Sequence, residues 1–183
     1  MKVITGTAKG RVLKTLDGLE TRPTTQRVKE ALFSVLQFDI EGRRVLDLFA
    51  GSGQLGIEAL SRGAKSAVFI DSSKKAVSVI KENLLKTGFS SCSKVYCSES
   101  IQFLTLNSDT YDIVFIDPPY GRGLAEKTLY SIDGLLCAGS VAVCEHDVHD
   151  ILPNTVGTLE MFQKKQYGRI CITFYRKRSG RLE

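Results

Sequence analysis

The chain has 183 residues, 43% of them hydrophobic, which is enough for one sizeable core and too few for two ordinary domains and a linker. No apolar run approaches the roughly 18 residues that a membrane span requires, and the opening MKVITGTAKGR is too polar for a secretory signal. We therefore expect one domain over residues 1–183, located in the cytoplasm, with no membrane partner.

The formal net charge of +5 is unevenly distributed along the chain. Residues 1–29 contain seven Lys and Arg against two acidic residues, and residues 164–183 contain seven against one, whereas the middle contains eleven against seventeen. Basic ends of this kind are typical of a chain that contacts a polyanion, because Lys and Arg neutralise phosphates. Two solvated basic ends would give the same pattern.

The first 38 residues predict a basic arm followed by a helix. The stretch VITGTAKGRVLKT alternates around Gly6 and Gly10, which predicts a short hairpin or arm over residues 1–22 that turns at the glycines. Residues 23–38 repeat their apolar side chains at helical spacing, so that one face of the expected helix is apolar.

Strand-like and helix-like segments then alternate over residues 43–177, which predicts an α/β fold whose parallel sheet has helices on both faces. The last two strand-like segments, TLEMFQKKQYG and RICITFYRKR, meet at Tyr167–Gly168 and predict a terminal hairpin. The earlier strand-like segments are RVLDLF, SAVFID, KVYCSES, DIVFID and SVAVCEH, with helices expected over 53–62, 74–88 and 124–136 and a short one after KVYCSES.

Cysteine and histidine content argues against a disulfide framework and a metal site. The five cysteines form no CxxC pair, and their odd number leaves one without a partner. Only His146 and His149 are available as imidazole ligands. We expect reduced cysteines, most of them in the core, and no bound metal.

A glycine-rich turn follows the first strand in VLDLFAGSGQLGIEAL. Gly51, Gly53 and Gly56 match GxGxxG, and Asp71 ends the next strand, at a spacing that allows an acid to bind ribose hydroxyls. Glycines in such a turn let a ligand approach the backbone closely. The pattern by itself fits any adenosine cofactor, NAD included.

Asp47, at the end of the first strand, favours a cofactor without phosphate. A pyrophosphate at the N-terminus of the following helix would be repelled by this carboxylate. The cationic amino-acid tail of S-adenosylmethionine would instead be attracted to it. An acid, a glycine turn and a ribose-binding acid in this order therefore favour S-adenosylmethionine.

The segment DIVFIDPPYGRG places Asp117 at the end of the fourth strand, where open α/β sheets bind their ligands. Asp117 can accept one N–H of an exocyclic base amine and the Pro118 carbonyl the other, which directs the nitrogen lone pair at a methyl donor. Pro118 and Pro119 hold that carbonyl because their φ is locked. Tyr120 can stack on the base, a contact worth about 1–3 kcal/mol. A tight turn that closes a buried strand would explain these residues alone, but not together with Asp47 and Asp71.

DLFAGSG, Asp71 and DPPY together resemble the class I S-adenosylmethionine-dependent amino-methyltransferases. TRPTTQRVKEALFSVL, VLDLFAGSGQLGIEALSRGA and DIVFIDPPYGRGL resemble, more narrowly, the bacterial small-subunit ribosomal RNA guanine-N2 methyltransferases of the RsmD family. The resemblance implies a Rossmann-like core over residues 43–177. Its sheet would have seven strands, mostly parallel, with an antiparallel strand inserted by the C-terminal hairpin.

The resemblance also implies roles for individual residues. The catalytic motif would be Asp117, Pro118, Pro119 and Tyr120. The S-adenosylmethionine site would be formed by Asp47, Phe49, Ala50, Gly51, Ser52, Gly53, Asp71, Ser72, Glu99 and Ser100. The RNA contacts would be Lys9, Arg11, Arg22, Thr24, Arg27 and Arg122.

Glu99 departs from the family pattern, because the residue that contacts adenine after the third strand is commonly an aspartate. The longer Glu99 side chain could reach the adenine amine. An acid that complements the dipole at a helix N-terminus would explain it equally well.

The predicted function is methylation of the N2 amine of a specific guanine in 16S ribosomal RNA, within an assembled or assembling small subunit. The enzyme would be a monomer that releases S-adenosyl-L-homocysteine. N6-adenine methylation of DNA or RNA is the main alternative, because the same DPPY geometry serves either amine. An NAD-dependent oxidoreductase and a non-catalytic RNA-binding module are more distant alternatives. A pyrimidine C5-methyltransferase would need a cysteine nucleophile, commonly beside proline, and the chain has no such pair.

Overall fold

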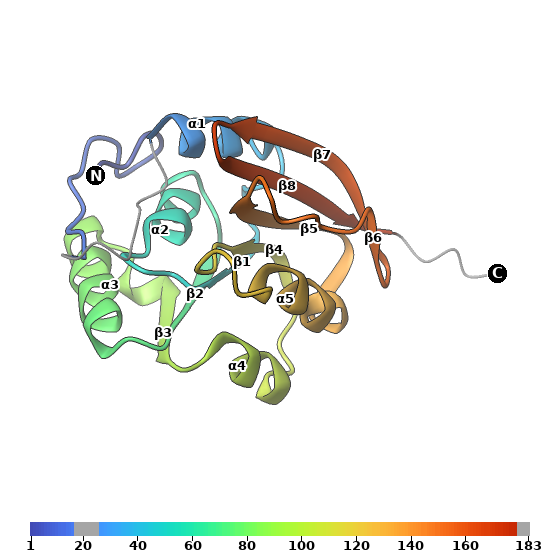
Figure 1. Cartoon of the computed structure of the whole chain (residues 1–183). Helices are drawn as coiled ribbons and strands as arrows, with labels where there is room; N and C mark the ends of the chain where they lie inside the picture. The colour runs from blue at the N-terminus through green and yellow to red at the C-terminus, as the bar shows by residue number, and fades with distance from the viewer. Residues whose placement is uncertain (17–25, 179–183) are drawn as a thin grey trace.

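The computed structural model describes residues 1–16 and 26–178 of the chain. A mixed sheet of eight strands runs through this part of the molecule (Figure 1). The strands lie in the order β3-β2-β1-β4-β5-β8-β7-β6. Their bounds are β1 Arg44–Leu48, β2 Ser66–Asp71, β3 Ser93–Cys97, β4 Tyr111–Ile116, β5 Leu136–Asp147, β6 Thr155–Val156, β7 Leu159–Tyr167 and β8 Ile170–Lys177.

The sheet confirms the expected α/β fold with its antiparallel C-terminal strand. Strands β1 to β5 are parallel to one another, and β8 enters antiparallel between β5 and β7. Strand β6 brings the sheet to eight strands. It contains only Thr155–Val156, which pair with Leu159 and Glu160 of β7 across a turn at Gly157. Two residues carry no usable periodicity, so this strand was not expected from the sequence.

Helices cover both faces of the sheet, as the alternating pattern predicted. One core contains apolar residues from α1, α2 and α3 together with Val45 and Phe115 of the strands. The other core contains residues from α4 and α5 together with Leu46 and Ile116. The helices are α1 Gln26–Val35, α2 Gln54–Ser61, α3 Lys74–Thr87, α4 Ser100–Leu106 and α5 Leu124–Ile132. None of the described helices is long and apolar enough to cross a membrane.

The helix expected over 124–136 ends earlier than its pattern suggests. Helix α5 stops at Ile132, a 3₁₀ turn follows over Asp133–Leu135, and β5 already begins at Leu136. The pairing of β4 with β5 shifts from Tyr111↔Leu136 to Ile113↔Val141, so the intervening residues of β5 form an irregularity. Pairing with β4 therefore determines where β5 begins, and local propensity does not reveal it.

Residues 1–16, the described part of the N-terminal arm, contain a hairpin with Lys2 paired to Val12, and residues 17–22 of the expected arm lie outside the described residues. The Val3 N–H donates to the Arg11 carbonyl at 3.0 Å, and the Gly10 N–H donates to the Val3 carbonyl at 2.9 Å. Gly6 and Gly10 both have positive φ, where glycine is favoured. The arm buries Val3, Ala8 and Leu13 in the core shared with α1 and α2, so it is an integral part of the fold.

Candidate active site

The parallel pairing of the strands brings the glycine turn and the DPPY segment to one edge of the sheet. Leu48, the last residue of β1, lies beside Ile70 of β2 and Ile116 of β4. Asp71 ends β2, and Asp117 directly follows β4. The carboxyl ends of parallel strands meet in this way at the place where open α/β sheets bind ligands.

The turn between β1 and α2 has an unusual backbone. Phe49 is the one described residue other than glycine with positive φ, at 60°, and Gly51 and Gly53 follow at 57° and 77°. Such a conformation costs about 1–3 kcal/mol in a residue with a side chain, and it is concentrated at functional sites. The Gly53 N–H donates to the Ala50 carbonyl at 2.7 Å and closes the turn before Gln54 begins α2.

Asp47 is buried beneath this turn, with 2% of its surface exposed. Its Oδ2 accepts the N–H of Gly56 at 2.9 Å. A Cβ added at Gly56 would lie 2.3 Å from Cε1 of Phe69, so the third glycine lets α2 pack against the sheet. Burial raises the pKa of Asp47 to about 8, although the Gly56 hydrogen bond opposes the shift, and the charge of Asp71 adds to it. Sequence reasoning did not anticipate that Asp47 would accept a backbone hydrogen bond from α2.

Asp71 is half-buried and is held by two backbone donors. Its Oδ2 accepts the Gly51 N–H at 2.9 Å, and its Oδ1 accepts the Ser73 N–H at 2.8 Å. These bonds orient the carboxylate against the glycine turn. The Ser98 N–H donates to the Asp71 carbonyl, which places the segment after β3 beside this acid.

The residues expected at the adenine end of the cofactor differ in accessibility. Ser72 and Glu99 are exposed, whereas Ser100 is buried at the start of α4. The Glu99 side chain makes no capping hydrogen bond to the helix. The roles of these three residues remain predictions.

Asn83 supports the turn from α3, and sequence reasoning missed it. This fully buried side chain donates from Nδ2 to the Ser52 carbonyl at 2.9 Å and to the Lys14 carbonyl at 3.0 Å. Its Oδ1 accepts the Lys14 N–H at 2.8 Å. Asn83 therefore ties the end of the arm to the cofactor turn. The available signal was an amide on the apolar side of the helix KKAVSVIKENLLKT.

In the DPPY segment, Asp117 is half-buried, Pro118 is buried, and Pro119 and Tyr120 are exposed. The Tyr120 hydroxyl donates to Oε1 of Glu145 at 2.8 Å, and Glu145 is only 3% exposed. Sequence reasoning also missed Glu145, which interrupts the otherwise apolar strand SVAVCEH. The last three residues of the motif also line a pocket of about 80 Å³, which is formed by residues 118–126 together with His146, Asp150, Ile151 and Leu152.

Cys144 does not have the surroundings of a nucleophile. It is completely buried in β5, and burial raises the pKa of its thiol well above the usual value, with the charge of Asp117 adding to the shift. Among the described residues, no group of three or more His, Cys, Asp and Glu side chains is placed to hold a metal ion.

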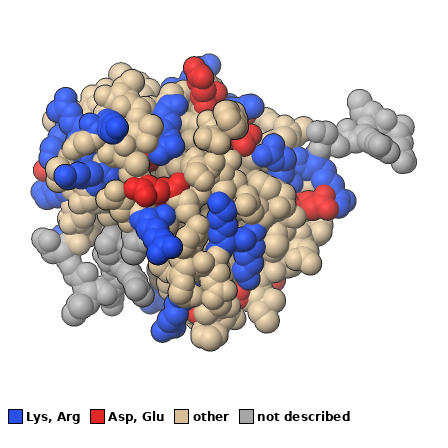
Figure 2. Space-filling model, turned by 90° about the horizontal axis from the view of Figure 1, so that it is seen from above, with Lys and Arg blue, Asp and Glu red and all other residues tan. Residues whose placement is uncertain are grey.

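The residues expected to contact RNA lie at several places on the surface. Lys9 and Arg11 are exposed on the arm, Arg27 is exposed at the start of α1, and Arg122 is exposed beside the pocket after Tyr120. Arg22 and Thr24 lie outside the described residues. Figure 2, seen from above Figure 1, shows Lys and Arg side chains spread over one face with few Asp and Glu among them.

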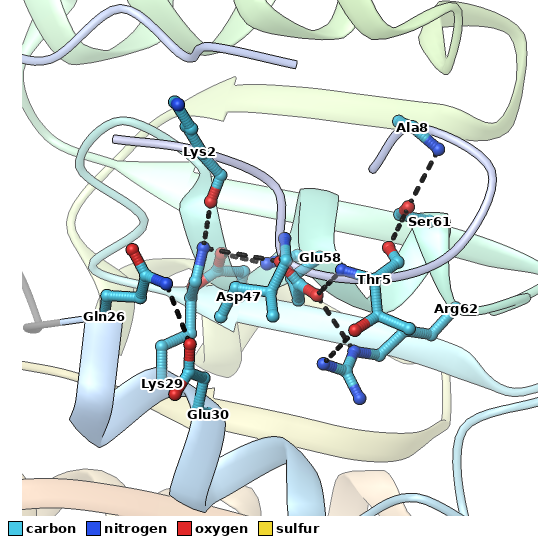
Figure 3. Close-up of polar contacts among 12 residues, drawn as sticks. Lys2, Thr5, Ala8, Gln26, Lys29, Glu30, Asp47, Glu58, Ser61 and Arg62 are labelled. Carbon is cyan, nitrogen blue, oxygen red and sulfur yellow. Dashed lines mark hydrogen bonds and ion pairs between the residues drawn. The ribbon is translucent and has the colours of Figure 1, made fainter. Parts of the chain in front are cut away.

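A buried ionic network holds the arm in place (Figure 3). Glu58 of α2 is fully buried and accepts the N–H groups of Ile4 and Thr5 at 2.8 and 3.0 Å. Lys29 of α1, 1% exposed, lies with its Nζ 3.3 Å from Glu58 Oε2 and donates to the Lys2 carbonyl. Arg62 donates from Nε to Glu58 at 2.9 Å. Side chains from α1 and α2 thus anchor the basic arm to the rest of the fold.

Comparison with known proteins gives consistent matches over nearly the whole chain. The family model described as Conserved hypothetical protein 95 matches residues 1–176. "Putative rRNA methyltransferase YlbH" of Bacillus subtilis is 40% identical, covering 97% of this chain and 100% of the relative. "Ribosomal RNA small subunit methyltransferase D" of Escherichia coli K12 is 35% identical, covering 97% and 90%. The solved structure of "Putative methyltransferase yhhF" from Escherichia coli has a TM-score of 0.89 at 35% identity, covering 98% and 99%.

Proposed function

This chain belongs to the RsmD family of S-adenosylmethionine-dependent RNA methyltransferases, and on that basis we propose that it methylates the N2 amine of one guanine in 16S ribosomal RNA. The observation that carries the proposal is the position of Asp117 and Pro118 beside the glycine turn, through the pairing of Leu48 with Ile116. An amine held by the DPPY segment would face a methyl donor held by the turn.

The residues around the turn fit S-adenosylmethionine. Asp71 offers a carboxylate, already oriented by two backbone donors, to ribose hydroxyls. A Cβ built on Gly51 would meet nothing within 4 Å, so the surface above this residue is open to a ligand. In its ionised form Asp47 disfavours a pyrophosphate and suits a cationic amino-acid tail, which can displace the proton that burial favours. When bound, the cofactor supplies the methyl group.

The DPPY segment would prepare the amine for attack. The lone pair of a guanine N2 amine is delocalised into the ring, which makes it a poor nucleophile. Asp117 accepts one N–H and the Pro118 carbonyl accepts the other, drawing the nitrogen toward a tetrahedral shape with its lone pair free to attack. Tyr120 supplies a stacking surface for the base. After transfer, the amine loses one proton, and Asp117 is the carboxylate hydrogen-bonded to it.

The substrate we propose is the small ribosomal subunit, assembled or assembling, in the cytoplasm. The target base must leave its stack to reach Asp117, at a cost of a few kcal/mol, and a single-stranded loop lowers that cost. Lys9, Arg11 and Arg27 would contact phosphates, and Arg122 would lie at the mouth of the site. A monomer suffices for this reaction, because one chain supplies every residue in the proposal.

The test is methyl transfer from radiolabelled S-adenosylmethionine to small ribosomal subunits from cells that lack the gene, followed by nucleoside analysis. Label in N2-methylguanosine of 16S RNA is the expected result. Label in N6-methyladenosine would keep the mechanism and change the target base. No labelled nucleoside would contradict the proposal, provided that the protein binds the cofactor. Naked 16S RNA, assayed in parallel, shows whether the particle is required.

A further inference from the structure

Glu145 is a buried carboxylate beside the catalytic motif, and the proposed mechanism does not use it. It lies near the carboxyl end of β5, is 3% exposed, and accepts the Tyr120 hydroxyl at 2.8 Å. Burying a carboxylate is costly unless strong partners compensate it. A glutamine would offer Tyr120 the same carbonyl acceptor without a charge. The negative charge is the property that distinguishes Glu145 from a glutamine at the same position.

The register of the sheet places Glu145 next to Asp117. Strands β4 and β5 pair in parallel with Phe115↔Val143 and Ile116↔Cys144, so the following residues are Asp117 and Glu145. Residues opposite one another on neighbouring strands point to the same face and are about 5 Å apart. Phe115 and Val143, two positions earlier, share one core, which identifies that face.

These groups surround the site of the methyl-accepting base with hydrogen-bond acceptors. Asp117 and Glu145 present carboxylate oxygens, and Pro118 presents a backbone carbonyl with no N–H of its own. Beside its N2 amine, guanine carries a further donor, N1–H. Adenine carries at the corresponding position an N1 lone pair beside its N6 amine. The adjacent N1–H and N2 donors of guanine fit such a site, whereas the N1 lone pair beside the N6 amine of adenine does not.

Resting on the proposed function, we propose that Glu145 makes the acceptor site selective for guanine by accepting its N1–H while Asp117 and Pro118 hold the N2 amine. The hydroxyl of Tyr120 orients the Glu145 carboxylate for this contact. An adenine in the same place would direct its N1 lone pair at a buried carboxylate. A site built to hydrogen-bond a substrate group discriminates strongly against an analogue that lacks it.

The test substitutes 2-aminopurine for the target guanine, at the position located by the labelling experiment, in ligated 16S RNA reconstituted into small subunits. This base keeps the 2-amine but has no N1–H. For the unmodified enzyme we expect kcat/KM to favour guanine by about 10- to 100-fold, the range of one charge-assisted hydrogen bond. Glu145→Gln should lower this ratio to within about threefold of unity, because the amide can donate to the N1 lone pair.

Three control variants separate base recognition from a structural role. Tyr120→Phe removes the hydroxyl but keeps Glu145, and it should reduce the guanine preference less than Glu145→Gln does. Glu145→Asp retains the carboxylate and should keep more of the guanine preference than Glu145→Gln does. Its methylation rate should be lower than that of the unmodified enzyme. Glu160→Gln changes an exposed glutamate on the distant strand β7 that is paired with Arg178, and it should alter neither the rate nor the ratio. Thermal unfolding of each variant establishes that it is folded.

The outcomes distinguish this inference from the proposed function. If the enzyme labels guanine N2 and Glu145→Gln slows guanine and 2-aminopurine equally, the selectivity role is overturned and the proposed function stands. If Glu145→Gln is unfolded, Glu145→Asp decides: a preference lost despite the retained carboxylate overturns the inference. If the unmodified enzyme labels no guanine, the proposed function fails and the inference fails with it.

Discussion

At the scale of single residues, the three acids at the sheet edge have different surroundings and therefore different expected roles. Asp47 is buried and bound by Gly56, Asp71 is held by Gly51 and Ser73, and Asp117 is half-buried at the start of DPPY. Their residue type and order were evident in the sequence. Their burial and their donors depend on the packing of α2 and on the conformation of the turn.

The roles of Asp117 and Asp71 can be separated by substitution. We expect Asp117→Ala to lower kcat by at least about 100-fold while the dissociation constant of S-adenosylmethionine changes little, because in the proposed mechanism this carboxylate holds the acceptor base and not the cofactor. Asp71→Ala should instead raise that dissociation constant about tenfold or more, because the carboxylate proposed to bind the ribose is lost. Calorimetry and single-turnover kinetics measure the two effects. The reverse pattern would overturn both assignments.

The raised pKa of Asp47 predicts that cofactor affinity depends on pH. With a pKa of about 8, this group is mainly protonated at neutral pH, and a cationic ligand must displace the proton. The affinity for S-adenosylmethionine should therefore rise between about pH 5.5 and pH 7, by at most about tenfold per unit, while the ligand amine stays charged. Asp47→Asn should flatten the profile. A flat profile in the unmodified protein would show that Asp47 does not respond to the ligand charge.

The same shift predicts how the stability of the free protein depends on pH. A carboxyl whose pKa is higher in the folded than in the unfolded state stabilises the fold below the unfolded value. This contribution is lost as the pH rises from about 4 through about 8. Asp47→Asn should reduce the fall in the free energy of unfolding over this range, measured by urea denaturation. An unchanged profile would mean that other groups cause the pH dependence.

At the scale of elements, the arm is held by α1 and α2 through Glu58 and Lys29, which lie far from it in the chain. We expect Glu58→Ala to lower the free energy of unfolding by about 3–5 kcal/mol, because it leaves Lys29 buried without its partner. Hydrogen exchange of the Ile4 and Thr5 amides should accelerate as well, because both donate to Glu58.

Glu82 provides a matched control for Glu58. It is an exposed acid that binds Lys14 of the same arm at 2.6 Å. Glu82→Ala should cost less than about 1 kcal/mol, because exposed ion pairs contribute little to stability. Equal effects of the two substitutions would mean that burial does not determine how the arm is anchored.

At the scale of the whole molecule, the charge distribution predicts how RNA binding depends on salt. Each Lys or Arg that contacts a phosphate releases a counterion when RNA binds. Lys9→Ala combined with Arg11→Ala should weaken binding and reduce the slope of log K against log salt by about 1.4 to 1.8. Lys65→Ala with Lys86→Ala removes the same charge from exposed positions outside the arm and should change the slope less. Equal changes in both double variants would exclude a specific role for the arm.

The sequence by itself determined the fold class, the glycine turn, the position of DPPY and the family, because these depend on residue types and spacings within short segments. Tertiary structure decided which distant residues support them. Glu145 contacts Tyr120 across 25 positions, Asn83 contacts Ser52 across 31, and Glu58 contacts Ile4 across 54. The start of β5 and the short strand β6 likewise depend on pairing with neighbouring strands. Such contacts depend on sheet register and helix packing, which arise when the whole chain folds, so a local pattern can mark a polar residue among apolar ones but does not identify its partner.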